Sequence, residues 1–294
     1  MAAPQYLLGQ VVSAHGRQYQ VELLTGPDIG KCLLCVPRGK KSDVVCGDTV
    51  QLKTTSPNQG VIEAIEPRQN LLYRSNEFRQ KLIAANVNQV VVVCAVEPAF
   101  SEDLLTRCLV AASHEEMAVC IVLNKADLID RLPAAQQILA PYEALGYPVI
   151  TLSAKENVEA LRQCLHDKTT VLVGQSGMGK STLINALIPD AAAATREIST
   201  VLDSGKHTTT YARLYHLNPN SHLIDSPGLQ AFGLAHLSHL EIAMAFSEFR
   251  PFLGKCRFRD CHHRQEPGCA LIAANAAGHI SPQRLAVYQR LTAG

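Results

Sequence analysis

The stretch Gly174–Thr182 constrains this chain most, because its pattern G-x-x-x-x-G-K-[ST] forms a phosphate site only between a strand and a helix. The apolar residues 171–173 precede it, and residues 183–188 follow with the apolar spacing of a helix. Glycines in such a loop let backbone N–H groups converge on phosphate oxygens, and the helix N-terminus adds partial positive charge. An ordinary glycine and serine turn before a helix is the alternative interpretation. The predicted phosphate-site residues are Gly174, Gln175, Ser176, Gly177, Met178, Gly179, Lys180, Ser181 and Thr182.

Within this loop, we expect Lys180 to reach the β- and γ-phosphates and to take part in catalysis. The Ser181 hydroxyl is expected to ligate Mg²⁺. The strand 221–224 leads into Asp225-Ser226-Pro227-Gly228, where Asp225 can hold Mg²⁺ through a water and the Gly228 N–H can sense the γ-phosphate.

Two other strand ends indicate that the base is guanine. An Asp127 carboxylate can accept hydrogen bonds from both N1–H and the 2-amino group of guanine, and adenine lacks both donors. We expect Asn124 to tie its loop to the phosphate loop, the Lys125 stem to cover one face of the base, and the Ala154 N–H to meet the guanine O6. The predicted guanine-site residues are Asn124, Lys125, Ala126, Asp127, Ser153, Ala154 and Lys155.

The polar stretch 199–210 is expected to supply the residues that catalyse hydrolysis. A loop of this length in a nucleotide domain is typical of a segment ordered by the γ-phosphate. One of Thr208 and Thr209 is expected to give Mg²⁺ a second hydroxyl, and the sequence leaves open which one. Many GTPases position water with Gln after the D-x-x-G glycine, but that residue here is the apolar Leu229. We therefore predict His207 as the group that orients water, the alternative being a surface histidine without a task.

The order of these motifs is unusual, because the base-binding motifs precede the phosphate loop. This order indicates a circularly permuted GTPase, which is physically tolerable since domain termini tend to lie close together at the surface. Expected strands at 89–96, 118–123, 149–152 and 171–173 alternate with expected helices at 102–115, 133–145 and 158–165. That alternation predicts a parallel sheet with helices on both faces. Residues 70–78 are expected to be a polar connector.

Residues 1–70 contain five short alternating apolar and polar runs, broken by turn residues, which predict a small closed barrel. At this size the oligonucleotide-binding barrel is favoured. The basic cluster Arg38-Gly39-Lys40-Lys41 is a candidate RNA contact, with a solvated loop as the alternative. Cys32 and Cys35 are expected to be buried core residues rather than half of a metal site.

The C-terminal residues 241–294 contain three cysteines and two histidines within fourteen positions, denser than core packing needs. Cys256, Cys261 and Cys269 with one imidazole satisfy the tetrahedral preference of a structural Zn²⁺. These residues alone leave open whether His262 or His263 supplies that imidazole. Residues 250–294 carry seven Lys and Arg against two Asp and Glu, which indicates a polyanionic partner. Arg257, Arg259 and Arg264 are candidate phosphate contacts.

Composition excludes several classes of protein. The N-terminus lacks the pattern of a secretory signal, and the longest apolar run, residues 90–96, is too short to cross a bilayer. Ten cysteines in such a chain favour reduced thiols and a metal site over a disulfide framework. We therefore expect a cytoplasmic, monomeric protein without a membrane partner.

Nearly the whole chain resembles the RsgA (YjeQ) family of small-ribosomal-subunit biogenesis GTPases. The resemblance rests on Asn124–Asp127 ahead of the phosphate loop, residues 205–209, Asp225–Gly228 and the C-x₄-C-x-H-x₅-C string. It implies GTP hydrolysis stimulated by the small ribosomal subunit and its rRNA, with release of maturation factors late in assembly, and implicates His207 in hydrolysis. It selects His263 and gives the zinc ligands Cys256, Cys261, His263 and Cys269.

The sequence thus predicts a multidomain α/β chain: an N-terminal OB-fold β-barrel at 1–70, a circularly permuted P-loop GTPase domain at 71–240, and a C-terminal helical zinc-binding domain at 241–294. The expected activity is RNA-stimulated GTP hydrolysis on the small ribosomal subunit, with GTP and GDP as ligands. An RNA-binding adaptor that uses GTP as a structural ligand is the alternative. A GTPase acting on a protein or membrane partner is a third, without a lipidation signal to support it.

Overall fold

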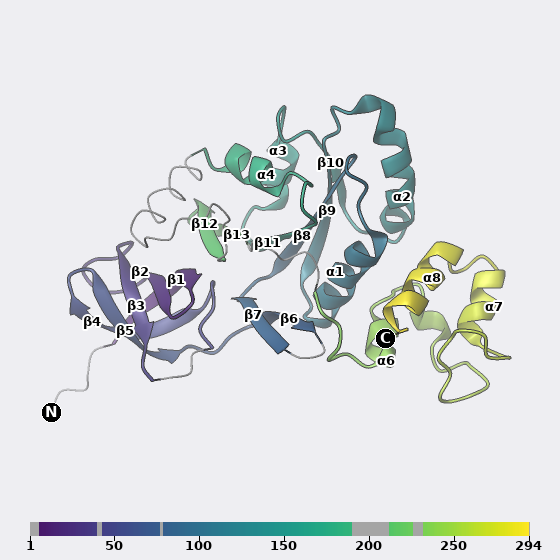
Figure 1. The fold of residues 1–294 in the computed structure, drawn as a ribbon, viewed down its shortest axis with the longest axis horizontal. Coiled ribbons are helices and arrows are strands. Elements are labelled where there is room, and N and C mark those ends of the chain that lie inside the picture. Colours follow the sequence, from purple (N-terminus) through teal and green to yellow (C-terminus); the bar gives the residue numbers. More distant parts are fainter. Residues whose placement is uncertain (1–5, 40–42, 77–78, 190–211, 226–231, 294) are drawn as a thin grey trace.

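The computed structural model describes residues 6–39, 43–76, 79–189, 212–225 and 232–293, which form three modules in a row (Figure 1). A β-barrel lies at one end, an α/β module in the middle, and a small helical module at the other end. The predicted order of a barrel, an α/β module and a helical module is therefore confirmed. Among the described residues, no helix is both long and apolar enough to cross a bilayer.

The barrel closes because its first strand, β1 (Leu7–His15), pairs on both sides, with β2 (Gln18–Leu23) and with β4 (Thr49–Ser56). Alternating side chains fill the interior, so that Val11, Val21 and Val50 are fully buried while their neighbours along the strands are more exposed. The same alternation separates the two cysteines: Cys35 is buried in the barrel core, as expected, but Cys32 is exposed, which corrects that part of the prediction. The barrel strands are β1 (Leu7–His15), β2 (Gln18–Leu23), β3 (Cys32–Pro37), β4 (Thr49–Ser56) and β5 (Gln59–Ile65).

The central sheet is buried on both faces, which explains its continuous apolar strands. Along β8 (Gln89–Ala95) every residue is buried, and successive side chains enter opposite layers. Val92 packs in the layer that contains Leu109 of α1, whereas Val91 packs in the layer that contains Leu183 of α4. The other elements are α1 (Glu102–His114), β9 (Ala118–Asn124), η1 (Ile129–Arg131), α2 (Leu132–Ala144), β10 (Val149–Thr151), α3 (Glu159–Cys164), β11 (Thr169–Val173) and α4 (Lys180–Leu187).

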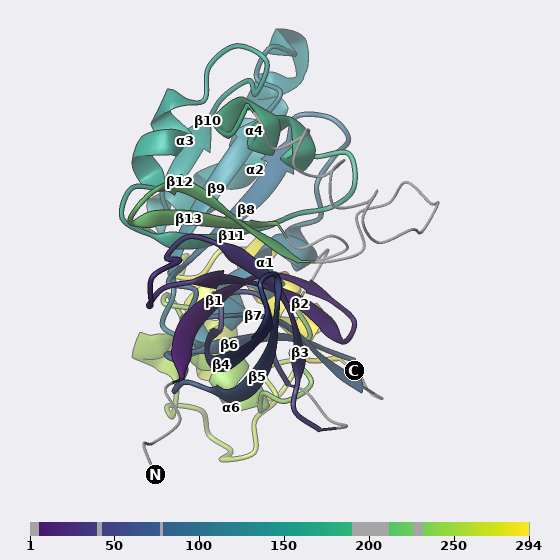
Figure 2. The same ribbon diagram turned by 90° about the vertical axis from the view of Figure 1, so that its left-hand side faces the viewer.

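The barrel and the central module share one sheet, which the sequence did not predict. The parallel strands β10, β9, β8, β11 and β13 (Ser221–Asp225) are followed by β12 (Arg213–Asn218), the last and, in the described part of the chain, only antiparallel strand that the central module contributes to this sheet. Strand β1 of the barrel pairs with β12 through Ser13 and Arg213. The barrel strands and the central strands therefore form one continuous sheet of eleven strands. Figure 2 shows the barrel below β12 and β13, against this edge of the sheet. Side chains also connect the two modules. His216 of β12 contacts Glu22 of the barrel at 2.6 Å and His222 of β13 at 2.8 Å.

Residues 70–78 are not a simple connector, and that expectation was wrong. The structure has β6 (Leu71–Asn76) paired antiparallel with β7 (Arg79–Ala85) as a separate two-stranded sheet. Leu72 and Ile83 anchor this hairpin because both are buried in the apolar layer under α1. An isolated pair of strands is marginally stable, so this sheet depends on packing against the central module, which the local sequence pattern does not reveal.

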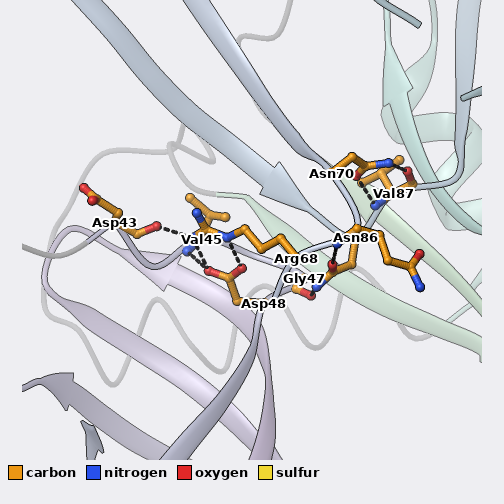
Figure 3. A network of polar contacts seen from close by, with 9 residues as sticks. Asp43, Val45, Gly47, Asp48, Arg68, Asn70, Asn86 and Val87 are labelled. Carbon is orange, nitrogen blue, oxygen red and sulfur yellow. Dashed lines mark hydrogen bonds and ion pairs between the residues drawn. The ribbon is translucent and has the colours of Figure 1, made fainter. Parts of the chain in front are cut away.

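A polar network fixes the passage from the barrel into the central module (Figure 3). The Arg68 guanidinium donates to both carboxylate oxygens of the fully buried Asp48, at 2.7 and 2.8 Å. The Asp48 carboxylate also accepts from the Val45 N–H at 2.8 Å. On the other side, the Asn86 side chain donates to the Gly47 carbonyl at 2.9 Å. These bonds join segments on both sides of the connection, so the two modules are held in a defined orientation.

The C-terminal module packs on α1 through its last helix. Arg284 is 3% exposed, makes a 2.8 Å ion pair with Glu248, and lies 4.4 Å from the centre of the Phe246 ring. Arg290 pairs with Asp103 in the first turn of α1 at 2.6 Å. The elements of this module are α6 (His239–Met244), η2 (Arg250–Phe252), α7 (Ala270–Ala276) and α8 (Pro282–Leu291).

Replacing Arg68 with Ala is expected to destabilise the barrel by about 3–5 kcal/mol, because the buried Asp48 carboxylate loses its charged partner. Urea denaturation, combined with hydrogen exchange of the Val11 amide that donates to the Asp48 carbonyl, measures this loss. The matched control is Arg38→Ala, whose exposed pair with Glu63 should matter little. Equal losses in the two variants would contradict the importance of the buried pair.

Candidate nucleotide site and metal cluster

The candidate nucleotide site is built from loops that leave the carboxyl ends of parallel strands, where open α/β sheets bind their ligands. The phosphate loop follows β11 and runs into α4, which begins at Lys180. Asn124 is the last residue of β9, and residues 153–155 follow β10. Asp225 is the last residue of β13 and pairs in register with Leu172 of β11. Residues 190–211 and 226–231, which include His207, Thr208, Thr209, Gly228 and Leu229, lie outside the described residues.

At two positions of the phosphate loop, no residue other than glycine fits. Gly174 has φ +155°, and a Cβ there would lie 2.4 Å from the Val93 carbonyl oxygen. Gly179 has φ +88°, and a Cβ there would lie 2.3 Å from the Asn124 side-chain nitrogen. Contacts this short do not occur in proteins, so the loop requires glycine for close approach of the backbone.

Asn124 joins the three loops. Its amide is 1% exposed, donates to the Met178 carbonyl at 2.9 Å, and accepts from the Ala154 N–H at 3.0 Å. The structure thus places the Asn124 loop against the phosphate loop, in the arrangement that the sequence suggested. The same Ala154 N–H is expected from the sequence to meet the guanine O6, and that contact stays a prediction. The neighbouring Ser153 hydroxyl is buried and has no hydrogen-bond partner among the described residues.

The base-binding side chains differ in their exposure. Asp127 and Lys155 are exposed, and Lys125 and Ala126 are half-buried. The Lys125 ammonium donates to the Glu97 carbonyl at 2.6 Å, which holds its stem beside the phosphate loop. The Asp127 carboxylate is therefore accessible at the mouth of the site.

Lys180 and Asp225 influence one another at the phosphate end of the site. The Lys180 ammonium donates to the carbonyls of Gly174 and Gln175. Burial lowers the pKa of Lys180 below its usual value. Burial raises the pKa of Asp225, and the Lys180 charge works in the opposite direction. Ser181 and Thr182 are exposed at the start of α4, so both hydroxyls are accessible there.

The loop after β8 also belongs to the site, and the sequence analysis missed it. Gln175 accepts from the Ser101 N–H at 2.9 Å, and Ser101 is the N-cap of α1. A Cβ on Gly177 would touch Pro98 at 3.3 Å. Since ligand loops follow the carboxyl ends of such strands, the end of β8 was the available signal.

A second candidate site lies in the C-terminal module. Cys256, Cys261, His263 and Cys269 each offer one ligand atom, and these atoms all lie within 4.8 Å of one another. Within the described part of the chain, no other group of three or more such side chains is arranged to hold a metal ion. His263 Nδ1 lies 3.3 Å from Cys269 Sγ and 3.5 Å from Cys256 Sγ. His262 is exposed and lies outside this cluster.

The loop that carries the cluster is folded around the Glu266 carboxylate. This group accepts from the backbone N–H groups of His262, Arg264 and Gln265, at 2.8, 2.7 and 3.0 Å. Burial alone would raise the pKa of Glu266, but these hydrogen bonds lower it to about 2. The Ala270 N–H, in turn, donates to Cys256 Sγ at 3.3 Å. The ligand set is therefore positioned by the backbone of its own loop.

Comparison with known proteins agrees with this geometry. A family model described as RsgA GTPase matches residues 65–235. The small ribosomal subunit biogenesis GTPase RsgA of Burkholderia pseudomallei is 53% identical over 287 residues, which cover 96% of this chain and 90% of that protein. The protein of the same name from Paraburkholderia phytofirmans is 54% identical over 293 residues, covering 96% and 92%.

Two solved structures share the fold over nearly their whole length. YjeQ from Thermotoga maritima superposes with a TM-score of 0.74 at 30% identity, covering 98% of this chain and 97% of that one. YloQ, described as a circularly permuted GTPase, gives a TM-score of 0.71 at 28% identity, covering 99% and 96%. These similarities confirm the predicted permuted arrangement.

Replacing Asn124 with Ala is expected to lower GTP affinity by at least about tenfold, because two buried backbone groups lose their partner and the loops are no longer joined. Equilibrium titration with a fluorescent guanine nucleotide measures the effect. Asn157→Ala is the control, since Asn157 is exposed and bonds only locally to the Glu159 N–H. Unchanged affinity in the Asn124 variant would contradict the bridging role.

Proposed function

This chain belongs to the RsgA family of GTPases, and we propose that it hydrolyses GTP on the small ribosomal subunit during late assembly, with the subunit's rRNA stimulating turnover. The family match and the near full-length identity support this proposal. The observation that carries it is the Asn124 bridge, because that bridge assembles a guanine loop and a phosphate loop into one site.

Recognition of the base is proposed to depend on Asp127. Its exposed carboxylate can accept from both N–H donors on the guanine edge, whereas an adenine would leave it unpaired. The Lys125 stem would cover one face of the ring. Ser153, Ala154 and Lys155 would line the opposite loop, where the unpaired Ser153 hydroxyl is a donor suited to a polar ligand atom.

The phosphates would be bound by the backbone N–H groups of residues 174–182 and by the Lys180 ammonium. Because that ammonium already donates to two loop carbonyls, phosphate oxygens would replace acceptors of the same kind. Mg²⁺ is proposed to be held by Ser181, Asp225 and one of Thr208 and Thr209, with Gly228 sensing the γ-phosphate. The described members of that set, Ser181 and Asp225, offer the oxygen ligands that Mg²⁺ prefers.

His207 is proposed to position the attacking water. The apolar Leu229 cannot do so, and a histidine beside the Mg²⁺ threonines in sequence can accept a hydrogen bond from that water. The water attacks the γ-phosphorus, the bond to the β–γ bridging oxygen breaks, and GDP and phosphate leave.

The C-terminal cluster is proposed to hold one structural zinc ion. Three thiolates and one imidazole are the donor set that tetrahedral zinc prefers, and the four ligand atoms are already gathered within 4.8 Å. The bound metal would stabilise a loop whose residues 257–260 are all exposed and contribute no core of their own.

The partner is proposed to be rRNA of the small subunit, contacted by the barrel and the C-terminal module on either side of the nucleotide site. We further propose a cytoplasmic monomer. The competing proposal is an RNA-binding adaptor that needs GTP only as a structural ligand. It predicts that a Lys180→Ala variant that still binds nucleotide also keeps its role in subunit assembly.

Turnover of GTP is expected to rise when purified small ribosomal subunits are added to the wild-type chain, and His207→Ala is expected to reduce the stimulated rate by about 10²- to 10⁴-fold. Phosphate release, with and without subunits, measures both. His166→Ala, at an exposed histidine paired locally with Asp167, serves as the control. Equal rates with and without subunits would contradict the proposed stimulation. Equal affinity for adenine and guanine nucleotides would contradict the proposed guanine site, on which the rest of the proposal depends.

Replacing Cys261 with Ser is expected to reduce zinc content from about one ion per chain to near zero and to unfold the C-terminal loop. Elemental analysis gives the stoichiometry, and hydrogen exchange of the Ala270 amide gives the local stability. The matched pair His263→Ala and His262→Ala tests the ligand choice, since only the first should lose the metal. Loss of zinc in the His262 variant alone would show that the choice is wrong.

A further inference from the structure

An exposed aromatic ring stands on the loop of the metal cluster. Phe258 is 43% exposed, and its neighbours Arg257, Arg259 and Asp260 are exposed as well. Among the Phe and Tyr side chains whose exposure is described, the other exposed ring is that of Tyr6 in the barrel, at 39%. Leaving a phenyl ring in water is unfavourable, so such a ring is a candidate contact for a partner.

The cations around Phe258 are not used inside the molecule. Lys255, Arg257 and Arg259 make no ion pair with any residue that the structure describes, although Arg257 lies over the Phe258 ring at 5.5 Å. Arg264, by contrast, donates to the Thr292 carbonyl at 2.9 Å, so its guanidinium is partly committed to packing the last helix. Phe258 is therefore flanked along the chain by three cations that have no carboxylate partner among the described residues, and of these Arg257 lies over the ring.

The loop presents this ring in a fixed place. The Arg257 N–H donates to the Gly268 carbonyl at 3.0 Å, and the Arg257 side chain covers Gly268 so closely that a Cβ there would lie 2.9 Å from the Arg257 Cβ. The hydrogen bonds to Glu266 fix the adjoining turn. A binding group held in this way loses less conformational entropy when a ligand binds.

The barrel also has an exposed aromatic ring beside a cation, but there a carboxylate balances the positive charge. Lys53 lies 4.9 Å from the centre of the Tyr6 ring, but it is 4.0 Å from Glu63, which also pairs with Arg38. An anion at that surface would compete with the Glu63 carboxylate. The combination of an exposed ring with unpaired cations thus distinguishes the C-terminal loop from the barrel.

We propose that Phe258 stacks on an unpaired RNA base while Lys255, Arg257 and Arg259 neutralise the phosphates beside it. Aromatic rings between cations suit single strands, because every base offers a π-face and the backbone carries charge. A paired stretch is excluded since its bases are already stacked within the helix. This inference rests on the proposed function and specifies it: the RNA at this module is single-stranded.

The test uses the full chain with its zinc content verified, and a short fluorescein-labelled oligouridine. Phe258→Ala is expected to weaken binding by about 5- to 150-fold, the loss of one stacked base, and to leave the salt dependence of binding unchanged. Arg259→Ala is expected to weaken binding less and to reduce the slope of log K against log salt by about 0.7, the loss of one phosphate contact on a single strand. Fluorescence anisotropy at several salt concentrations measures both quantities.

Three controls separate stacking from a structural effect. Phe258→Tyr should retain wild-type affinity, whereas Phe258→Leu should bind as weakly as the Ala variant. Leu240→Ala removes an apolar side chain on α6 of the same module that is even more exposed than Phe258, 64% against 43%, and should have no effect. An abasic strand of the same length should bind the wild type and Phe258→Ala equally, since it keeps the phosphates and lacks the bases.

Several results would overturn the inference: equal loss of affinity for a duplex and a single strand, retention of affinity in Phe258→Leu, or a changed salt slope in Phe258→Ala. Loss of binding to a ribosomal protein, with RNA affinity unchanged, would point to a protein partner instead. If the Phe258 variants behave as the wild type while subunits still stimulate GTP turnover, only this inference fails. If subunits do not stimulate the wild type, the proposed function itself fails.

Discussion

The nucleotide site depends on one buried amide. Asn124 uses its donor on the Met178 carbonyl and its acceptor on the Ala154 N–H, so a single side chain sets the separation of three loops. The interaction depends on where the loops lie in space and not on their order along the chain. A permuted chain can therefore keep the same site, provided that its new ends fall at the surface. The glycine at position 179 is part of the same constraint, because any Cβ there would collide with this amide.

Permutation also determines what is attached to the site. Along the chain, β12 and its neighbour β13 lie between residues 190–211, which include the predicted Mg²⁺ ligands Thr208 and Thr209, and residues 226–231, which include the predicted γ-phosphate contact Gly228. Strand β1 of the barrel pairs directly with β12, and Glu22 of the barrel contacts His216 of β12. The barrel therefore joins the sheet at the hairpin that connects both segments.

The C-terminal module is attached on the other side, through α1. Arg284 and Arg290 of α8 contact Thr106 and Asp103 of that helix. The N-cap of the same helix is Ser101, whose N–H donates to the Gln175 side chain of the phosphate loop. Each flanking module thus lies one element away from the nucleotide site, by a hydrogen-bonded connection. A change in the nucleotide site can therefore reach either flanking module through a single intervening element.

The sequence by itself determined the local chemistry: the phosphate loop, the guanine motif, the cluster of three cysteines and two histidines that offers a metal site, and the alternating strands of the barrel. Each is a pattern of neighbours along the chain, imposed by backbone conformation or by the geometry of one ligand. Only the tertiary structure decided that β1 extends the central sheet, that β6 pairs with β7, and that the Pro98–Ser101 loop packs on the phosphate loop. It also decided that the Arg264 guanidinium donates to the Thr292 carbonyl, whereas Arg257 and Arg259 make no ion pair with a described residue. Those outcomes are contacts between residues far apart in sequence, where burial and the competition for hydrogen-bond partners have no local period to reveal them.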